Sequence, residues 1–204
     1  MNIKILNYKI HIDFSFIFFI TLLFFINKSF FVISALLASM IHEFAHLVIL
    51  KKTTKANKID IDFSLFKLNI IDQNRSFTSF FDDLKVLFAG PILNFFTFIL
   101  FFAISKVSKN DRLYFFALEN LFLFIFNLLP IAPLDGGQIL FIILSSKFNF
   151  LFAKRIISTI SFILIYIMAF IGFFIFLYSK YNISILFLSV YIIFFLYKKI
   201  DFYF

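Results

Sequence analysis

Long apolar stretches separated by short polar segments are the feature that most constrains how this chain can fold. Of its 204 residues 63% are hydrophobic, and the mean hydropathy is +1.03. A soluble domain needs a polar face toward water, and this composition cannot supply one over most of the chain. The chain is therefore expected to lie in a lipid bilayer.

Six stretches reach or approach the roughly 20 apolar helical residues that a hydrocarbon core requires. The expected spans are 14–26, 30–50, 84–104, 113–144, 156–178 and 183–197. The fourth contains Pro130 and Pro133, which lack backbone donors and break a helix, so we expect this span to be interrupted. The sequence predicts an all-α polytopic membrane protein with about six transmembrane helices.

The 19 Lys and Arg residues are distributed unevenly between the two sides that six spans define. Most lie near the two termini and in loops 51–83 and 145–155, which fall on the same side. The positive-inside rule places this side in the cytoplasm, as expected for a multi-pass protein of a bacterial cell membrane with both termini inside. The net charge of +8 is explained by this orientation rather than by nucleic acid, because the basic residues form no single patch.

We expect one integral membrane domain over 1–204, with a core at 8–146 and accessory spans at 156–197. No cleavage site of small residues follows the first apolar stretch, so a removable signal peptide is not expected. The chain has no cysteine, which excludes a disulfide framework and a thiolate metal site.

The segment HEFAH at 42–46 places two histidines four residues apart inside an apolar span. On a helix this spacing projects His42 and His46 from one face toward one ion, with Glu43 beside them. Neutral imidazoles suit Zn²⁺, and a catalytic zinc takes three protein ligands and keeps one position open. The alternative is a chance spacing, but burying ionisable groups in hydrocarbon is costly unless they are paired or bound to a metal.

A second polar feature is NLLPIAPLDGG at 127–137, where the fourth span breaks. Asp135 can supply the third zinc ligand from a non-helical stretch, since the prolines unwind the backbone and the glycines allow close approach. The alternative is that Asp135 only caps the following helix. That interpretation leaves the zinc short of a ligand. Glu119 and His11 are assigned no role in the site.

Three motifs in this order, HEFAH, FAGPILN at 88–94 and NLLPIAPLDGG, resemble the site-2 protease family of intramembrane metalloproteases, peptidase family M50. The resemblance implies one zinc per chain held by His42, His46 and Asp135, with Glu43 as general base. It also suggests that Asn127 and Asn94 bind substrate or transition state. From sequence alone, the segment around Gly90 and Pro91 predicts a kinked helix start.

Within this family the chain is most similar to the stage IV sporulation protease branch, which processes the pro-sigma-K precursor. The resemblance implies a membrane-embedded or membrane-associated protein substrate and inhibitory membrane proteins as possible partners. The chain departs from other branches of the family, because we expect neither a PDZ domain between its spans nor a CBS domain after the last one. An alternating pattern at 59–68 predicts a strand and resembles the family's membrane-associated β-hairpin, to whose edge an extended substrate could add.

Two other classes of function fit part of the pattern. A zinc transporter could also carry His and Glu at helical spacing, but it predicts several polar spans or an internal repeat. A catalytically silent membrane binding protein would be free to lose HExxH or LDGG, and both are intact here. A site-2 protease with a different substrate, such as an anti-sigma factor, also remains an alternative.

Overall fold

The computed structural model divides the chain into two compact units, Met1–Ile125 and Phe126–Phe204. The residues that it describes are 2–5, 8–12, 30–54, 59–64, 67–72 and 79–179. The expected first and sixth spans, 14–26 and 183–197, lie outside these residues. The predicted single domain over 1–204 stays a prediction.

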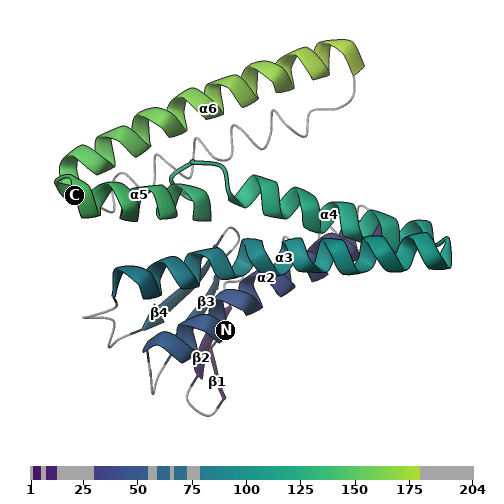
Figure 1. Ribbon diagram of the computed structural model, residues 1–204, viewed down its shortest axis with the longest axis horizontal. Coiled ribbons are helices and arrows are strands. Elements are labelled where there is room, and N and C mark those ends of the chain that lie inside the picture. The colour runs from purple at the N-terminus through teal and green to yellow at the C-terminus, as the bar shows by residue number, and fades with distance from the viewer. Residues whose placement is uncertain are drawn as a thin grey trace. The chain divides into compact units, whose positions relative to one another are not determined.

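A four-stranded sheet belongs to the first unit, and its strand order is β1-β2-β3-β4 (Figure 1). The strands are β1 Asn2–Ile5, β2 Tyr8–Ile12, β3 Ile59–Ser64 and β4 Lys67–Asp72. The pairs β1/β2 and β3/β4 are antiparallel, whereas β2 and β3 are parallel. A parallel pair needs a long crossover, and the chain between β2 and β3 includes a 25-residue helix. The two N-terminal strands were not predicted, and membrane association of the sheet stays a prediction.

Three described helices are long and apolar enough to cross a membrane: α2 Phe30–Thr54, α3 Phe80–Ser108 and α6 Phe150–Ser179. Their 25, 29 and 30 residues exceed the length that a hydrocarbon core about 30 Å thick requires. The protein is therefore an integral membrane protein. These three helices coincide with the second, third and fifth predicted spans.

Helix α3 is bounded by local signals at both ends. Ser79 caps its N-terminus, with its hydroxyl oxygen accepting from the Asp82 backbone N–H at 3.2 Å. Lys109, in the left-handed conformation, ends it and turns the chain into α4, Asp111–Asn127. Pro91 lies inside this continuous helix, so the predicted helix start at Gly90 is wrong. The apolar residues before the motif and the Ser79 cap begin the helix ten residues earlier.

Helix α3 buries small and polar side chains and exposes large apolar ones. On α3 the buried residues are Gly90, Pro91, Asn94, Thr97 and Ser105, which recur at helical spacing. Its phenylalanines at 88, 95 and 96 are exposed. Small residues let helix backbones approach closely in a bilayer, where lipid solvates the apolar side chains. The phenylalanine-rich surface is therefore consistent with contact to lipid.

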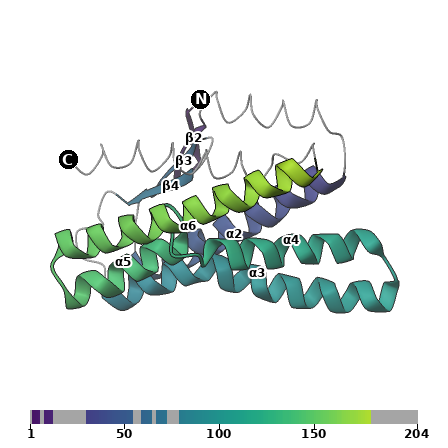
Figure 2. The same cartoon turned by 90° about the horizontal axis from the view of Figure 1, so that it is seen from above.

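The described part of the second unit contains the end of α4, helix α5 Asp135–Lys147 and helix α6 (Figure 2). The predicted interruption is present: helical structure stops after Asn127 and resumes at Asp135. Ile131 and Ile165, both fully buried, form the centre of an apolar cluster between the interrupting segment and α6. This packing fixes the segment that leads into α5.

Candidate metal centre

The two motif histidines lie one turn apart on α2, and both are buried, with exposed fractions of 5% for His42 and 7% for His46. Their Nε2 atoms are 3.1 Å apart, and the imidazole planes meet at 76°. The HExxH spacing on a regular helix produces this convergence directly. The two side chains thus present two nitrogen atoms to one point inside the first unit.

The orientation of His46 is fixed from the neighbouring helix. Its Nδ1–H donates to the backbone carbonyl of Val86 on α3 at 2.7 Å. A proton on Nδ1 leaves the lone pair on Nε2, the atom that faces His42. Such a hydrogen bond on the far nitrogen is the arrangement that orients a metal-binding histidine.

Gly90 provides the space that the imidazoles occupy. A Cβ atom at this position would lie 2.7 Å from both Cε1 and Nε2 of His42, and nearer still to Nε2 of His46. Any side chain here would displace the histidines, so glycine is required by close approach. Sequence reasoning found this motif only by resemblance, and a glycine before a proline within an apolar span was its local signal.

The pair matches the geometry that zinc requires. Two nitrogens bonded to one tetrahedral zinc at 2.0–2.1 Å are about 3.3 Å apart. The observed separation of 3.1 Å is close to this value. Glu43 lies on the same helix and is half-buried. The first unit can therefore supply two zinc ligands and a carboxylate beside them.

Asp135 belongs to the second unit, where it is the first residue of α5 and is half-buried. The N-cap position is held by Leu134, whose backbone is extended and which makes no side-chain cap hydrogen bond. Asp135 is therefore not the cap residue, and its predicted place in a non-helical stretch is also wrong. The helix begins at Asp135, where its positive N-terminus favours a carboxylate.

The segment that precedes Asp135 is held by its backbone. Successive turns bond Ile131 N–H to the Leu129 carbonyl and Leu134 N–H to the Ile131 carbonyl, each at 2.8 Å. The Ala132 N–H donates to the Ser161 hydroxyl on α6, also at 2.8 Å. These bonds satisfy polar groups that the membrane interior leaves without water. Sequence reasoning missed Ser161, whose signal was a serine within a mostly apolar span.

Both LDGG glycines are required by close approach to this segment. A Cβ at Gly136 would meet the backbone carbonyls of Leu128 and Leu129, and one at Gly137 would meet the carbonyl of Ile131. Neither glycine has a positive φ. Their role is therefore to let the first turn of α5 lie directly against the preceding chain.

The remaining predicted site residues fall on different elements. Asn94 is on α3 and is completely buried, whereas Asn127 is the last residue of α4 and is half-buried. Glu119 on α4 hydrogen-bonds to Ser34 on α2. His11 lies on β2, outside the helices that carry the motifs.

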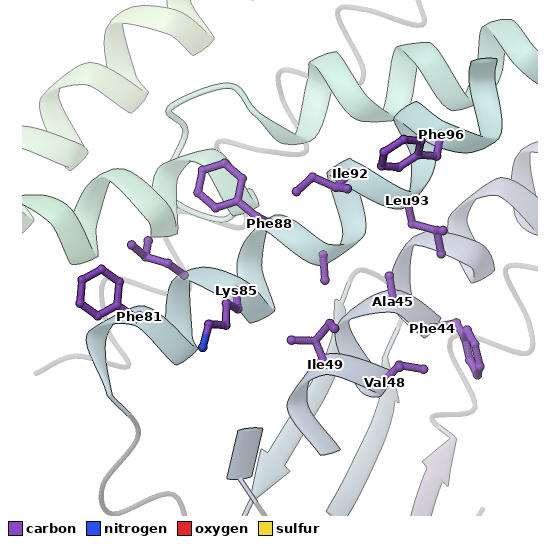
Figure 3. A pocket seen from close by; sticks show the side chains of 12 residues that line it. Phe44, Ala45, Val48, Ile49, Phe81, Lys85, Phe88, Ile92, Leu93 and Phe96 are labelled. Atoms are coloured by element: carbon purple, nitrogen blue, oxygen red, sulfur yellow. The ribbon is translucent and has the colours of Figure 1, made fainter. Parts of the chain in front are cut away.

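An apolar groove of about 680 Å³ runs between α2 and α3 (Figure 3). Two motif residues, Phe44 and Ala45, line it, and Figure 3 shows Phe88 and Phe96 of α3 at its side. The two histidines are not among its lining residues. The groove therefore belongs to the apolar surface of these helices and is distinct from the histidine site.

Comparison with known proteins gives concordant similarities. A profile of Peptidase family M50 matches residues 110–168, a region that contains Asn127 and Asp135 but not the histidine helix. A zinc metalloprotease of Methanocaldococcus jannaschii is 36% identical over 95 residues, 44% of this chain and 28% of that protein. The matched region thus spans less than a third of that curated relative.

A solved structure has a similar fold over nearly the whole chain. It is a site-2 protease from Methanocaldococcus jannaschii, which aligns with a TM-score of 0.64 and 25% sequence identity. The alignment covers 95% of this chain and 92% of that one. Together these similarities support a metalloprotease.

Proposed function

We propose that this protein is an intramembrane zinc metalloprotease that hydrolyses a peptide bond in or near the membrane segment of another protein. The observation that carries the proposal is the buried histidine pair, whose Nε2 atoms are 3.1 Å apart while Val86 fixes the tautomer of His46. The hydrogen bond to Val86 leaves the lone pair of His46 on Nε2, the atom that faces His42. The similarities to zinc and site-2 proteases support the same activity.

His42, His46 and Asp135 would hold one zinc ion per chain. Two neutral imidazoles and one carboxylate leave the fourth tetrahedral position open, which is the ligand set of a catalytic site. One finding supports Asp135: it follows a segment held by hydrogen bonds and close-packed glycines. A carboxylate that only contacts solvent does not need a rigid segment before it.

Glu43 would act as general base and then as general acid. Zinc, when bound, acts as a Lewis acid and lowers the pKa of a water molecule in its open position. Glu43 accepts a proton from the attacking water molecule, and the oxygen of that water adds to the peptide carbonyl carbon. The same carboxyl then gives this proton to the leaving amine, so that one water molecule is consumed and no net proton is released to the site.

Asn94 and Asn127 would bind the substrate or the transition state. An Asn side chain can donate to a peptide carbonyl and accept from a peptide N–H, which suits an unwound stretch of substrate backbone. Asn94 lies one turn after Gly90, the residue against the imidazoles. Its position near the histidines supports this role.

The substrate would be a membrane-embedded or membrane-apposed regulatory protein, such as a sporulation sigma-factor precursor. An anti-sigma factor is the alternative substrate. A helical segment must unwind before its carbonyl can reach the site, so helix-weakening residues are expected near the cleaved bond. The resemblance to the sporulation branch also predicts inhibitory membrane partners, and the distribution of Lys and Arg predicts that both termini are cytoplasmic.

The first experiment is co-expression with a sigma-factor precursor, comparing the wild type with Glu43→Gln. The variant should retain zinc and lose about a thousandfold in cleavage rate, because it keeps the ligands and removes the base. Zinc content of the purified proteins is measured in parallel, and Asp111→Asn, at the exposed start of α4, serves as the matched carboxylate-to-amide control. Cleavage by the wild type and by the control variant, but not by Glu43→Gln, supports the proposal.

Three results would contradict parts of the proposed function. Purified wild-type protein without tightly held zinc would exclude a metalloprotease. Zinc binding with no cleavage of the sigma-factor precursor, but with cleavage of an anti-sigma factor, would retain the protease and exclude the sporulation role. Zinc uptake into proteoliposomes that is unaffected by Glu43→Gln would instead favour a transporter.

A further inference from the structure

A second group of polar side chains lies within the helices of the first unit. Asn94 on α3 and Asn120 on α4 are completely buried, and Ser34 on α2 has an exposed fraction of 1%. Glu119, beside Asn120, hydrogen-bonds to Ser34. Polar groups at such positions are rare in membrane helices and usually serve a function.

The contacts between helices place this group behind the histidine pair. Asn94 follows Gly90 by one turn, about 6 Å along the helix, and Gly90 touches both imidazoles. Ser34 precedes His42 by eight residues, about 12 Å along α2, on the same buried face as Ala38. The polar group therefore starts one turn from the histidines and extends away from them.

Helix α4 runs alongside the same two helices. Phe124 packs on Phe95 with ring centroids 4.9 Å apart, and Phe116 packs on Phe101 at 4.8 Å. These contacts show that α4 is antiparallel to α3, as Figure 2 also shows. Asn120 lies between the two contacts along α4, so it is close in height to Asn94 and Thr97.

Several polar atoms in this group have no hydrogen-bond partner within the part of the chain that the structure describes. They are both amide atoms of Asn94, Oδ1 of Asn120 and Oε2 of Glu119. The Asn120 amide nitrogen donates to the Phe116 carbonyl at 2.8 Å, so only its oxygen remains. Buried polar groups need partners, and such atoms mark places for an unseen small molecule.

The unpartnered atoms specify the chemistry of that molecule. The Asn94 nitrogen needs an acceptor, whereas the oxygens of Asn94, Asn120 and Glu119 need donors. A metal cation could satisfy the oxygens but not the amide nitrogen. Water satisfies both kinds of atom, and buried waters typically make about three hydrogen bonds.

We propose that Ser34, Asn94, Glu119 and Asn120 form a hydrated pocket between α2, α3 and α4 that supplies water to the histidine site. Each hydrolysed peptide bond consumes one water molecule, whose oxygen joins the acyl carbon and whose hydrogens go to the two products. Lipid around the histidine site limits its access to bulk water, so water bound one helical turn from the histidines would be a nearby source for hydrolysis. The supply role rests on the proposed hydrolytic function, whereas the presence of water does not.

Radiolytic footprinting of the zinc-loaded full chain in lipid nanodiscs tests whether the pocket holds water. Hydroxyl radicals formed from bound water oxidise nearby side chains, and the probe is Phe116, one helical turn before Asn120 and 8% exposed. Ile165, in the apolar cluster of the second unit and 1% exposed, is the control. With each rate normalised to the denatured chain, Phe116 should react about tenfold faster than Ile165, since water fills polar cavities and leaves apolar ones dry.

Equal normalised rates at Phe116 and Ile165 would overturn the pocket and leave the proposed protease untouched. Asn120→Leu, which replaces an amide by an apolar side chain of similar size, should reduce the Phe116 rate to that of Ile165. Asn120→Ser should restore it. Oxidation of Phe116 that is unchanged by Asn120→Leu would also overturn the proposal.

Kinetics test the supply role. Asn120→Leu should lower kcat about tenfold, as changes behind a metal site commonly do, with KM and zinc content unchanged. Asn120→Ser should recover most of this loss. A loss accompanied by zinc release or a lower Tm would assign Asn120 a structural role and overturn the supply function.

Discussion

The two parts of the proposed metal centre are held in different ways. The histidine pair belongs to a regular helix, where the spacing of HExxH alone brings Nε2 of His42 and His46 to 3.1 Å. Asp135 instead follows an irregular segment whose shape depends on turns, on Ser161 and on two glycines. A helix satisfies its own backbone in lipid, whereas an interrupted span must find external partners.

The difference predicts where each part is vulnerable. The histidine side depends on side-chain space, because Gly90 and the Val86 carbonyl set the imidazole positions. The aspartate side depends on backbone packing and hydrogen bonds. Substitutions around the histidines should therefore alter metal affinity more than folding, and substitutions before Asp135 should alter folding together with metal affinity.

The largest effect is expected from removing a ligand on either side. His46→Ala and Asp135→Ala should each abolish tight zinc binding, because two protein ligands do not hold a catalytic zinc firmly. Zinc per chain is measured after dialysis against a weak chelator, with Glu43→Gln as the control that retains the metal. An Asp135→Ala protein that keeps zinc as firmly as the wild type would show that the third ligand is another residue.

The next largest effect is expected at the two glycines in the first turn of α5. Gly136→Ala or Gly137→Ala would press a methyl group against backbone carbonyls, which should cost about 2–3 kcal/mol of stability. Tm in detergent and zinc content should fall together. Ser145→Ala, on the same helix and bonded only within it to the Ile142 carbonyl, is the control. Zinc loss at an unchanged Tm would contradict the backbone role.

Much of this comparison could be predicted from the sequence, and the missing parts share a cause. HEFAH predicts the histidine pair because helical spacing is local, and Pro130 with Pro133 predicts the interruption for the same reason. The contacts of Val86 with His46 and of Ser161 with Ala132 join residues 40 and 29 positions apart. Such pairs depend on helix packing, which periodicity within one span does not specify.

The helix start of α3 illustrates the same limit. Gly90 and Pro91 resemble a helix boundary, yet α3 continues through them. The apolar surroundings and neighbouring helices override the local preference of proline, which is tolerated in membrane helices. Gly90 is explained only by the imidazoles of His42 and His46 on α2. Asp135 similarly proved to be the first helical residue, because helix boundaries depend on the packing of the preceding segment.

A smaller effect is expected on the histidine side from Gly90→Ala. The added methyl group should displace the imidazoles and weaken zinc binding about 10- to 100-fold, while Tm without metal changes little. Zinc affinity is measured by competition with a chelator of known strength. Ala89→Val adds more volume one residue earlier, toward the groove between α2 and α3, and should leave the affinity unchanged. Equal losses in both variants would indicate general disturbance of α3.

The smallest effect is expected from Ser161→Ala on the aspartate side. The Ser161 hydroxyl accepts from Ala132 N–H and donates to the Ile157 carbonyl, so its loss leaves a buried backbone N–H without a partner. This should cost about 1–2 kcal/mol of stability and lower zinc affinity to a similar degree. Ser161→Thr should retain both, because it keeps the hydroxyl. Thr159→Ala removes a hydroxyl that bonds only to its own helix, at the Arg155 carbonyl, and should have little effect on either measurement. A Ser161→Ala protein with lower Tm and unchanged zinc affinity would show that the segment before Asp135 stabilises the fold without orienting the ligand.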